Sequence, residues 1–423
     1  MRVLMLTWEY PPVVVGGLGR HAHALATALA AAGHDVVVLG RRPTGTDATT
    51  HPTLDSVVDG VRVLAVAEDP PHLEFARDLV AWTLAMGHAM LRAGLTRLEA
   101  WRPDVVHAHD WLVAHPAVAL ADALDVPLVA TFHATEAGRF AGWLSAPLSR
   151  QVHSVEWWLA NRADTVITCS AAMRAEVAEL FEVHPAGITV AHNGITPREW
   201  RVRRARVTAT RRRLGTPLLF SYGRLEYEKG IQDLIAALPR IRKAHPGARL
   251  AVAGTGSAVP MLVETARAHR VRRSVTFLGH LPDDELAATL AAADAVVLPS
   301  RYEPFGIVAL EAAAAGSPLV ASTAGGLGEV VVDGETGVSF APGDVHGLAM
   351  AVGRVRADPR AATRRARAAR DRLAVDFCWT RIAEETAAVY ATATRRERVE
   401  LGRPKIPTGN VFGRTSAGCH SRR

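Results

Sequence analysis

Residues 3–39 read VLMLTWEYPPVVVGGLGRHAHALATALAAAGHDVVVL, and the order of patterns in this stretch decides the fold. A short apolar run at 3–7 ends in a loop rich in proline and glycine. An alanine-rich helical pattern at 20–32 follows, and Gly33 stands where helices commonly end. A second apolar run comes next, at 36–39. Short apolar strands that alternate with amphipathic helices predict a parallel sheet covered by helices.

The same strand and helix unit recurs along the chain. In the first half we predict further strands at 61–67, 105–108, 128–132, 165–169 and 188–191. In the second half we predict strands at 218–222, 250–253, 275–278, 295–298 and 319–321, with an edge strand at 338–340. The fold class is therefore α/β, with two doubly wound, Rossmann-like domains that face a cleft. Ligands of such sheets bind outside the carboxyl ends of the strands, where the motifs described below lie.

The domain boundaries follow from these two series of strands. We predict a first domain at 1–197, a second domain at 214–375, a terminal helical segment at 376–395 and a disordered tail at 396–423. The linker between the two domains lies near 196–213, a segment that holds one proline and eight arginines.

Composition limits the classes of protein to which the chain can belong. Its 423 residues suffice for two domains, and 49% hydrophobic with 22% charged residues is ordinary for a globular protein. Arginine carries almost all of the net charge of +7, since the three lysines are Lys229, Lys243 and Lys405. Three cysteines without paired spacing argue for a reducing compartment, without disulfides or structural zinc. Because the chain has neither an apolar run of about 18 residues nor a signal-peptide pattern, we expect a cytoplasmic protein.

The segment Gly223-Arg-Leu-Glu-Tyr-Glu-Lys-Gly230 offers two cations directly after a predicted strand. A diphosphate leaving group gains negative charge as its bond breaks, and cations already fixed in place stabilise that charge. Arg224 and Lys229 are therefore candidates for binding a diphosphate. The alternative is a surface ion-pair cluster in which both residues pair with Glu226 and Glu228.

The segment 302–311, YEPFGIVALE, places two carboxylates eight residues apart around a predicted helix start. Proline favours the first helical turn, so we expect the helix to begin near Pro304. Glu303 would then lie at the helix N-terminus and Glu311 two turns further on, in reach of a ribose; both have a structural alternative as ordinary helix residues. Free backbone N–H groups would face a phosphate from Phe305, Gly306 and Ile307.

Four further residues are candidates because of the loops in which they lie. Gly254 belongs to a lone Gly-x-Gly after a strand, for which a plain turn is the alternative. Gly17 lies in the loop 16–20, which can approach a phosphate through its backbone although its spacing is not the dinucleotide-binding fingerprint. Glu9 precedes that loop and can accept hydrogen bonds from sugar hydroxyls. Asn193 ends the last strand of the first half, where a turn is the alternative to a sugar contact.

Histidines end two of the predicted strands, so they would face the cleft. His107 and His109 alternate on one strand and share a face. With Asp110 they could form a metal site, but no further ligands have recognisable spacing, and we therefore expect no metal. We interpret His133 as a hydrogen-bonding group for a sugar hydroxyl.

Several catalytic motifs are absent from the sequence. It has no Walker A loop, no Asp-x-Asp pair for a divalent ion and no Gly-x-Ser-x-Gly elbow. Arginine, lysine and a helix N-terminus would therefore neutralise a diphosphate, without a metal or another cofactor. A nucleotide-sugar is a ligand that needs a diphosphate-binding group at one end and a sugar-binding group at the other. The sequence therefore predicts a nucleotide-sugar as the substrate.

Over roughly residues 1–390 the chain resembles the retaining glycosyltransferases of family 4. Residues 223–230 are similar to the phosphate-binding segment of that family, and residues 303–311 to its Glu-x7-Glu motif. The segments WEYPP with GGL, within 8–18, and HAHDW, at 107–111, resemble its glycogen-synthase side and actinobacterial α-1,4-glucosyltransferases. The resemblance implies two facing Rossmann-like domains, the GT-B fold, with a final helix that crosses back to the first domain.

The resemblance also implies roles for single residues. The residues that it and the motifs suggest for catalysis are Glu303, Arg224, Lys229 and His133. Candidates for donor binding are Gly17, Asn193, Arg224, Lys229, Gly254, Phe305, Gly306, Ile307 and Glu311. Glu9 and Asp110 would line the acceptor side, which belongs to the first domain. The implied reaction moves glucose, with retention, from ADP-glucose or UDP-glucose to the 4-hydroxyl of an α-1,4-glucan, as in glycogen or methylglucose lipopolysaccharide.

Three alternatives remain open from the sequence alone. The same scaffold could serve a sugar-nucleotide epimerase or hydrolase. A glycosyltransferase that uses a lipid or small-molecule acceptor at a membrane surface would suit the arginine excess, although no basic amphipathic helix with exposed aromatics is evident. Nucleic-acid binding through 198–213 is the least favoured, because that run interleaves no aromatic residue except Trp200.

Overall fold

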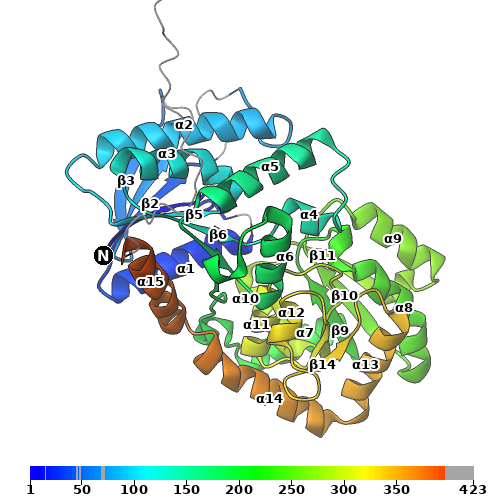
Figure 1. Ribbon diagram of the computed structural model, residues 1–423. Helices are drawn as coiled ribbons and strands as arrows, with labels where there is room; N and C mark the ends of the chain where they lie inside the picture. Colours follow the sequence, from blue (N-terminus) through cyan, green and yellow to red (C-terminus); the bar gives the residue numbers. More distant parts are fainter. Residues whose placement is uncertain (15, 44–45, 47–48, 68–71, 396–423) are drawn as a thin grey trace, which may run out of the picture.

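The computed structural model describes residues 1–14, 16–43, 46, 49–67 and 72–395, which form two α/β lobes (Figure 1). The strands of the first lobe are β1 (Arg2–Leu6), β2 (Asp35–Arg41), β3 (Leu54–Val58), β4 (Val61–Val66), β5 (Val105–His109), β6 (Leu128–Phe132), β7 (Thr165–Thr168) and β8 (Ile188–Val190). They form one sheet in the order β3-β4-β2-β1-β5-β6-β7-β8, parallel except for the pair β3 and β4.

The second lobe contains a six-stranded parallel sheet. Its strands are β9 (Leu218–Tyr222), β10 (Arg249–Ala253), β11 (Val275–Gly279), β12 (Ala295–Leu298), β13 (Leu319–Ser322) and β14 (Val338–Phe340). The order is β11-β10-β9-β12-β13-β14, so the direction of winding reverses between β9 and β12. In the first sheet it reverses between β1 and β5. Loops that leave neighbouring strands at such a reversal open a crevice for ligands. The segments 9–20, 107–110, 223–230 and 302–311, which hold the main motifs, lie at the carboxyl ends of β1, β5, β9 and β12.

Helices connect the strands and cover the sheets (Figure 1). Those of the first lobe are α1 (Gly17–Ala31), α2 (Leu79–Arg97), α3 (Ala114–Leu124), α4 (Glu136–Arg139), α5 (Pro147–Arg162) and α6 (Ala171–Phe181), with short 3-10 turns at Trp111–Val113, Pro185–Gly187 and Pro197–Trp200. Those of the second are α7 (Arg204–Leu214), α8 (Ile231–Ala244), α9 (Val259–Ala268), α10 (Asp283–Ala292), α11 (Ile307–Ala315), α12 (Leu327–Val330), α13 (Val345–Ala357) and α14 (Pro359–Asp376), with 3-10 turns at Tyr227–Lys229 and Arg272–Ser274.

The last helix, α15 (Trp379–Arg395), returns to the first lobe. It follows α14 in the chain but packs against α1, as Figure 1 shows. The hydroxyl of Tyr390, which is fully buried, lies 2.7 Å from Nδ1 of His107 in β5. The largest cluster of buried apolar side chains includes members of both lobes, among them Phe132 and Phe220. The two lobes therefore share one continuous hydrophobic core.

The predicted strands agree with the structure to within two residues at each end. The exception is β3, which the sequence did not indicate. β3 is an antiparallel edge strand with exposed Leu54, Val57 and Val58, so it lacks the buried apolar run on which the prediction relied. The predicted tail at 396–423 lies outside the described residues.

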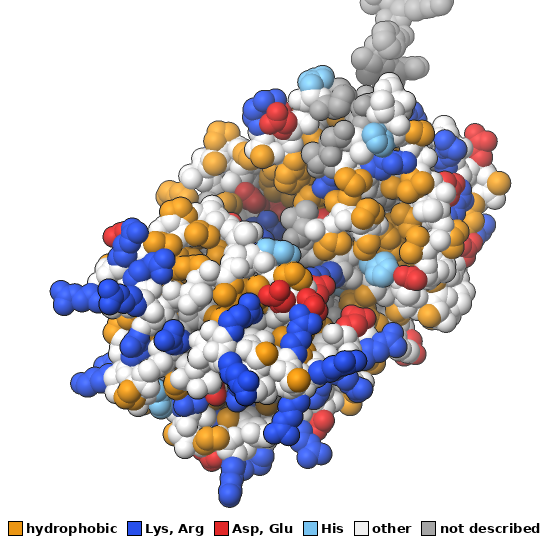
Figure 2. All heavy atoms as spheres, turned by 180° about the vertical axis from the view of Figure 1, so that it is seen from behind, with side chains coloured by type: hydrophobic (Ala, Val, Ile, Leu, Met, Phe, Trp, Pro, Cys, Tyr) orange, Lys and Arg blue, Asp and Glu red, His pale blue; other side chains and the backbone are white. Residues whose placement is uncertain are grey.

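The predicted linker at 196–213 is wrong in part, because residues 204–214 form α7, which packs on α10. The N-terminal turn of α10 carries three acidic residues. Arg206 of α7 lies 2.6 Å from Asp284 and Arg213 lies 3.8 Å from Glu285. Part of the arginine run therefore pairs within the protein. Figure 2 shows basic side chains spread over the lower lobe, with acidic side chains among them, rather than gathered in a stripe suited to nucleic acid.

No helix within the described ranges has the length and apolar character needed to cross a membrane.

Candidate active site

The N-termini of two helices from different lobes meet between the sheets. α1 follows β1 and α11 follows β12, and a Cβ atom on Gly17 would lie 2.8 Å from Cδ1 of Ile307. The residues that precede the helices are Gly16 and Gly306, neither of which caps its helix with a side chain. Neither first turn contains an acidic residue. Because helix N-termini carry unpaired N–H groups and partial positive charge, this point suits an anion held by both lobes.

The predicted start of the second helix at Pro304 is wrong, since α11 begins at Ile307. Gly306 precedes it with φ of 104°, a conformation that favours glycine, so residues 303–306 form a turn. The carbonyl of Pro304 accepts a hydrogen bond of 2.6 Å from Ser170 of the first lobe. Phe305 lies before the helix in this turn, and its buried ring packs edge-on to Phe377. Of the three predicted amide donors, Gly306 and Ile307 therefore stand at the helix N-terminus.

The two sequence motifs of the second lobe meet in an ion pair. Nζ of Lys229 lies 2.9 Å from Oε2 of Glu303, and both side chains are largely buried. The hydroxyl of Ser300 donates a second hydrogen bond, of 3.2 Å, to the same oxygen. The carboxylate of Glu303 is thus fixed at the end of β12, next to the N-terminus of α11. Removal of one partner from such a pair leaves a buried charge without compensation.

Arg301 also links the two motifs, and no sequence pattern predicted this role. Its guanidinium forms two hydrogen bonds, of 2.8 and 2.7 Å, with the carboxylate of Asp233 in α8. It also lies over the ring of Tyr227, 4.9 Å from the centroid. This paired, stacked geometry holds the loop after β12 against the loop after β9. Arginine is so frequent in this chain that one more could not be singled out.

Arg224 has a less constrained position than Lys229. Its side chain is half exposed and lies 3.3 Å from the carboxylate of Glu228, so it takes part in one of the surface ion pairs considered as an alternative. Its loop is closely packed all the same. Gly254 has φ of 122°, and a Cβ atom there would lie 1.8 Å from the carbonyl oxygen of Gly223. The Gly-x-Gly loop therefore supports the backbone before Arg224 rather than forming a plain exposed turn.

Glu311 is buried and contacts the other lobe. Its Oε2 accepts a hydrogen bond of 2.8 Å from the hydroxyl of Tyr222, and its Oε1 accepts one of 3.1 Å from Arg20 in α1. Burial raises the pKa of Glu311 to about 7, while Arg20 and the Tyr222 hydroxyl act in the opposite direction. The carboxyl group therefore titrates close to neutral pH, in a position shared by both lobes.

A cluster of histidines lies at the carboxyl ends of β5 and β6. Nδ1 of His109 lies 3.0 Å from Nε2 of His133, and the rings are stacked. His21 of α1 packs edge-on to His133. Burial lowers the pKa of His133 to about 4 and that of His109 well below its usual value, so these rings are neutral at pH 7. Neutral imidazoles can donate and accept hydrogen bonds with sugar hydroxyls.

The metal arrangement weighed from the sequence, His107 with His109 and Asp110, is not formed. His107 is enclosed between Tyr390 and Thr131, at 2.7 Å from each hydroxyl. Ligand nitrogens of His21, His109 and His133 do lie within 4.8 Å of one another, the one such group in the described part of the chain. His21 could not be assigned to this group from the sequence, because its helix packs beside the strand only in the folded protein.

The remaining candidates of the first lobe surround these histidines. Asp110, with φ of 61°, accepts a hydrogen bond of 2.7 Å from the backbone N–H of His133. Burial raises the pKa of Asp110 to about 6, against the effect of that hydrogen bond. Asn193 is buried next to His21. Glu9 is buried and accepts a hydrogen bond of 2.8 Å from the N–H of Gly16, so it is held in place next to the N-terminus of α1.

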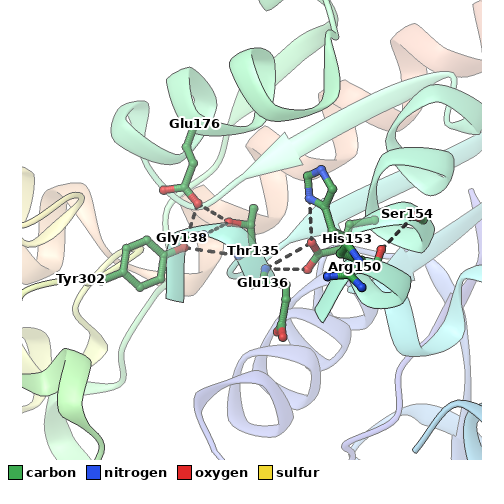
Figure 3. Close-up of polar contacts among 9 residues, drawn as sticks. Thr135, Glu136, Gly138, Arg150, His153, Ser154, Glu176 and Tyr302 are labelled. Carbon is green, nitrogen blue, oxygen red and sulfur yellow. Dashed lines mark hydrogen bonds and ion pairs between the residues drawn. The ribbon is translucent and has the colours of Figure 1, made fainter. Parts of the chain in front are cut away.

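A second set of contacts joins the lobes beside the site. Figure 3 shows the ring of Tyr302, from the second lobe, pointing at Thr135, Gly138 and Glu176 of the first. The Tyr302 hydroxyl donates to Oε1 of Glu176 at 2.9 Å and accepts from the N–H of Thr135 at 3.3 Å. The Thr135 hydroxyl donates to the same carboxylate oxygen. Tyr302 directly precedes Glu303, and Thr135 follows His133 by two residues, so this network connects the two halves of the site.

Glu329 of α12 makes a further contact between the lobes. Its carboxylate accepts hydrogen bonds of 3.1 and 2.9 Å from the backbone N–H groups of Ala171 and Ala172, at the N-terminus of α6. Gly325 and Gly326, which precede α12, pack against the backbone of Glu303 and Pro304, where a Cβ atom would lie within 2.4 Å of a carbonyl oxygen.

Known proteins resemble both lobes. Residues 15–199 match the family described as Glycosyltransferase Family 4, and residues 204–372 match Glycosyl transferases group 1. A glycogen synthase of Mycobacterium tuberculosis is 60% identical over 413 residues, which cover 96% of this chain and 98% of that protein. An α-maltose-1-phosphate synthase of the same species is 32% identical over 414 residues, with 92% and 99% covered.

Solved structures show the same architecture. Sucrose-phosphate synthase from Thermosynechococcus elongatus superposes with a TM-score of 0.75 at 23% identity, over 92% of this chain and 98% of that one. The catalytic domain of starch synthase IV from Arabidopsis thaliana, bound to ADP and acarbose, gives 0.73 at 20% identity, over 93% and 99%. The predicted fold of two facing Rossmann-like domains is therefore confirmed. With both family matches and a 60% identical relative along almost its whole length, the chain belongs to the family 4 glycosyltransferases of the GT-B fold.

Proposed function

We propose that the protein transfers glucose from a nucleoside-diphosphate glucose to the 4-hydroxyl of an α-1,4-glucan, with retention at the anomeric carbon. The observation that carries this proposal is the meeting of the N-termini of α1 and α11 next to the ion pair of Lys229 and Glu303. A glycogen synthase as the 60% identical relative supports glucose as the sugar and a glucan as the acceptor.

In this proposal the donor diphosphate lies against the N-termini of α1 and α11. Lys229 and Arg224 add positive charge that stabilises the departing diphosphate, and this needs no divalent ion. Glu303 lies beside the donor sugar and Glu311 holds the ribose. His133 and Asn193 contact the glucose from the first lobe. The glucan hydroxyl attacks from the face that the diphosphate leaves, and the leaving phosphate takes its proton.

Glucose incorporation into glycogen, from labelled ADP-glucose and UDP-glucose in parallel, tests this function. We expect transfer to require the glucan and to continue in the presence of a chelator. Lys229→Ala should lower kcat/KM by about a hundredfold or more, the usual cost of a charge-stabilising group. Lys243→Ala, an exposed lysine of α8, is the matched control. Donor cleavage that does not depend on the acceptor would instead show a hydrolase, and loss of turnover in chelator would show that a metal is needed.

A second candidate, transfer to a lipid or small acceptor at a membrane surface, has one observation in its favour. Phe140 and Trp143, between α4 and α5, are 52% and 75% exposed. Exposed aromatic side chains are typical of surfaces that lie at a lipid interface. Co-sedimentation with anionic vesicles, compared between the native protein and Trp143→Ala, separates this candidate from a glucan-directed enzyme. Binding that depends on Trp143 would favour it.

A further inference from the structure

A pocket of about 450 Å³ lies in the second lobe, at the end of the sheet opposite the donor site. Its lining includes Asp294, directly before β12, and Gly316, directly after α11. The donor-site motifs instead follow the carboxyl ends of β9 and β12. The pocket therefore opens at the amino ends of strands and is separate from the site described above.

Arginine side chains dominate the charge of this pocket. Four arginines line it, together with a single carboxylate from Asp294, and they are Arg211, Arg356, Arg367 and Arg370. One oxygen of Asp294 accepts a hydrogen bond of 2.7 Å from the N–H of Leu218. The other lies 3.7 Å from Arg211 and 3.4 Å from Arg356. Both distances exceed those of a charge-assisted hydrogen bond, so one carboxylate is shared loosely by two cations.

Beyond the contacts to Asp294, and within the described ranges, Arg356 keeps an unpaired donor, and the two pocket arginines of α14 have a weak ion pair or none. Nε of Arg356 is buried and has no hydrogen-bond partner among the residues that the structure describes. Arg370 and Arg367 are both exposed. Arg370 has no ion-pair partner in the described part of the chain, and Arg367 lies 3.9 Å from Asp371. A buried donor without a partner is costly, and this applies to Nε of Arg356. With four arginines and one carboxylate in its lining, the pocket carries an excess of positive charge that suits an anion.

The sequence of α14 explains why the pocket stays open. Ala362, Ala366 and Ala369 are buried on one face of this helix, spaced by four and three residues, and α14 packs on α11 and α13 through that face. Ala362 and Ala366 also line the pocket. Because alanine side chains are only methyl groups, α14 can lie close to α11 and α13. The methyl groups leave the space between the guanidinium groups unfilled. A longer apolar residue at either position would occupy the pocket.

We propose that this pocket binds a phosphate group, carried by a small sugar or free in solution. A phosphate offers oxygens that pair with two arginines at once, and Arg356 and Arg370 are the two placed to hold it. The volume lies within the range of small-molecule sites, roughly 300–1,000 Å³. The site does not depend on the proposed transfer reaction, since none of its lining residues belongs to the donor or acceptor candidates.

Isothermal titration of the full chain tests the proposal. The probes are inorganic phosphate, a hexose 6-phosphate and the uncharged hexose, titrated with a nucleoside diphosphate present in excess to fill the donor site. We expect one equivalent of phosphate or of the ester to bind, and the hexose not to bind. Tighter binding of the ester assigns a sugar phosphate as the ligand, while equal binding assigns the free anion.

Variants then locate the binding. Arg356→Ala and Arg370→Ala should each weaken the affinity by tenfold or more. Arg354→Ala on α13 and Arg364→Ala on α14, both exposed and outside the pocket, should leave it unchanged. Because Arg370 has no ion pair to lose, its variant tests the site without a change in the protein's own contacts. No binding of either probe at millimolar concentration, equal losses in the control variants, or displacement by the nucleotide would overturn the proposal.

Discussion

The surroundings of Glu311 set the pH range in which its carboxyl group can bind the donor of the proposed reaction. Its carboxyl group is buried, its pKa is about 7, and the hydroxyl of Tyr222 and the guanidinium of Arg20 hold its two oxygens. A carboxylate accepts hydrogen bonds from a ribose diol, whereas the protonated acid is a poorer acceptor. The ionised form is lost as the pH falls through the folded-state pKa.

We therefore predict that donor binding weakens in acid. The KM for the nucleotide-sugar should rise about tenfold between pH 8 and pH 6, since a group with a pKa near 7 is about one-tenth ionised at pH 6. Glu311→Gln should raise the KM at every pH and remove this dependence. Steady-state kinetics of both proteins across that range make the measurement. A native KM that is independent of pH would contradict the role of Glu311 in binding the ribose.

Glu156 of α5 predicts a pH dependence of stability, separate from activity. Burial raises its pKa to about 9, although the N–H of Glu136 donates to it. In the unfolded chain the group titrates near 4.5. Between those two values the folded protein holds one more proton than the unfolded chain, so the free energy of unfolding falls as the pH rises.

Glu156→Gln should remove that slope, which amounts to at most about 1.4 kcal/mol per pH unit. Thermal unfolding at pH 6, 7.5 and 9 should show the variant gaining stability over the native protein as the pH rises. Glu179→Gln, on the exposed face of α6, should follow the native protein. Parallel curves for Glu156→Gln and the native protein would disprove the prediction.

At the scale of elements, the close approach of α1 and α11 is the feature on which donor binding depends. A methyl group on Gly17 would meet Cδ1 of Ile307 at 2.8 Å, so Gly17→Ala should push the two helix N-termini apart. Overpacking costs about 1–3 kcal/mol, which corresponds to a loss of donor affinity of about tenfold or more. The helices themselves should remain folded, because alanine suits a helix better than glycine.

Ile307→Val removes the very atom that the new methyl group would meet. The double variant Gly17→Ala with Ile307→Val should therefore regain donor affinity, which titration with a nucleoside diphosphate measures. A loss in Gly17→Ala that the second substitution does not rescue would show that the approach of the helices is not its cause.

Elements with a buried apolar run were predictable from the sequence, and those fixed by contacts between distant segments were not. β6 and β9 were predicted to the residue because each is buried on both faces. The start of α11 was misplaced because Ser170 of the other lobe binds the carbonyl of Pro304 and delays the helix. β3 was missed because an exposed edge strand lacks the apolar run of a central one.

Residues of the candidate site were likewise predictable where they belong to a local sequence motif, and were missed where distant segments bring them together. The ion pair of Lys229 with Glu303 joined two motifs that the sequence had singled out separately. Arg20 and Glu176 lie on helices of the first lobe and contact residues of the second, while His21 reaches His133 only because α1 packs beside the strands of its own lobe. Spacing along a sequence carries no information on such distances, so these residues could not be found from it.

Tyr302 leads to the prediction that belongs to the whole molecule. Its hydroxyl binds Glu176 across the boundary of the lobes. A hydrogen bond to a charged group contributes about 1.5–3 kcal/mol, so Tyr302→Phe should shift the balance from closed towards open lobes by tenfold or more. Turnover should fall by a similar factor, because Glu303 and His133 meet the donor together only in the closed arrangement.

Small-angle scattering of the nucleotide-bound protein and steady-state kinetics test this together. Tyr302→Phe should enlarge the radius of gyration and lower kcat, while the affinity for the nucleoside diphosphate alone changes less, since Lys229 and Arg224 remain in the second lobe. Glu176→Gln keeps an oxygen that accepts from Tyr302 and should lose less activity than Glu176→Ala. Glu179→Ala on the same helix is the matched control. Full activity in Tyr302→Phe would show that the lobes close without this contact, and the remaining contacts of Glu329 and Ser170 would then suffice to hold the two halves of the site together.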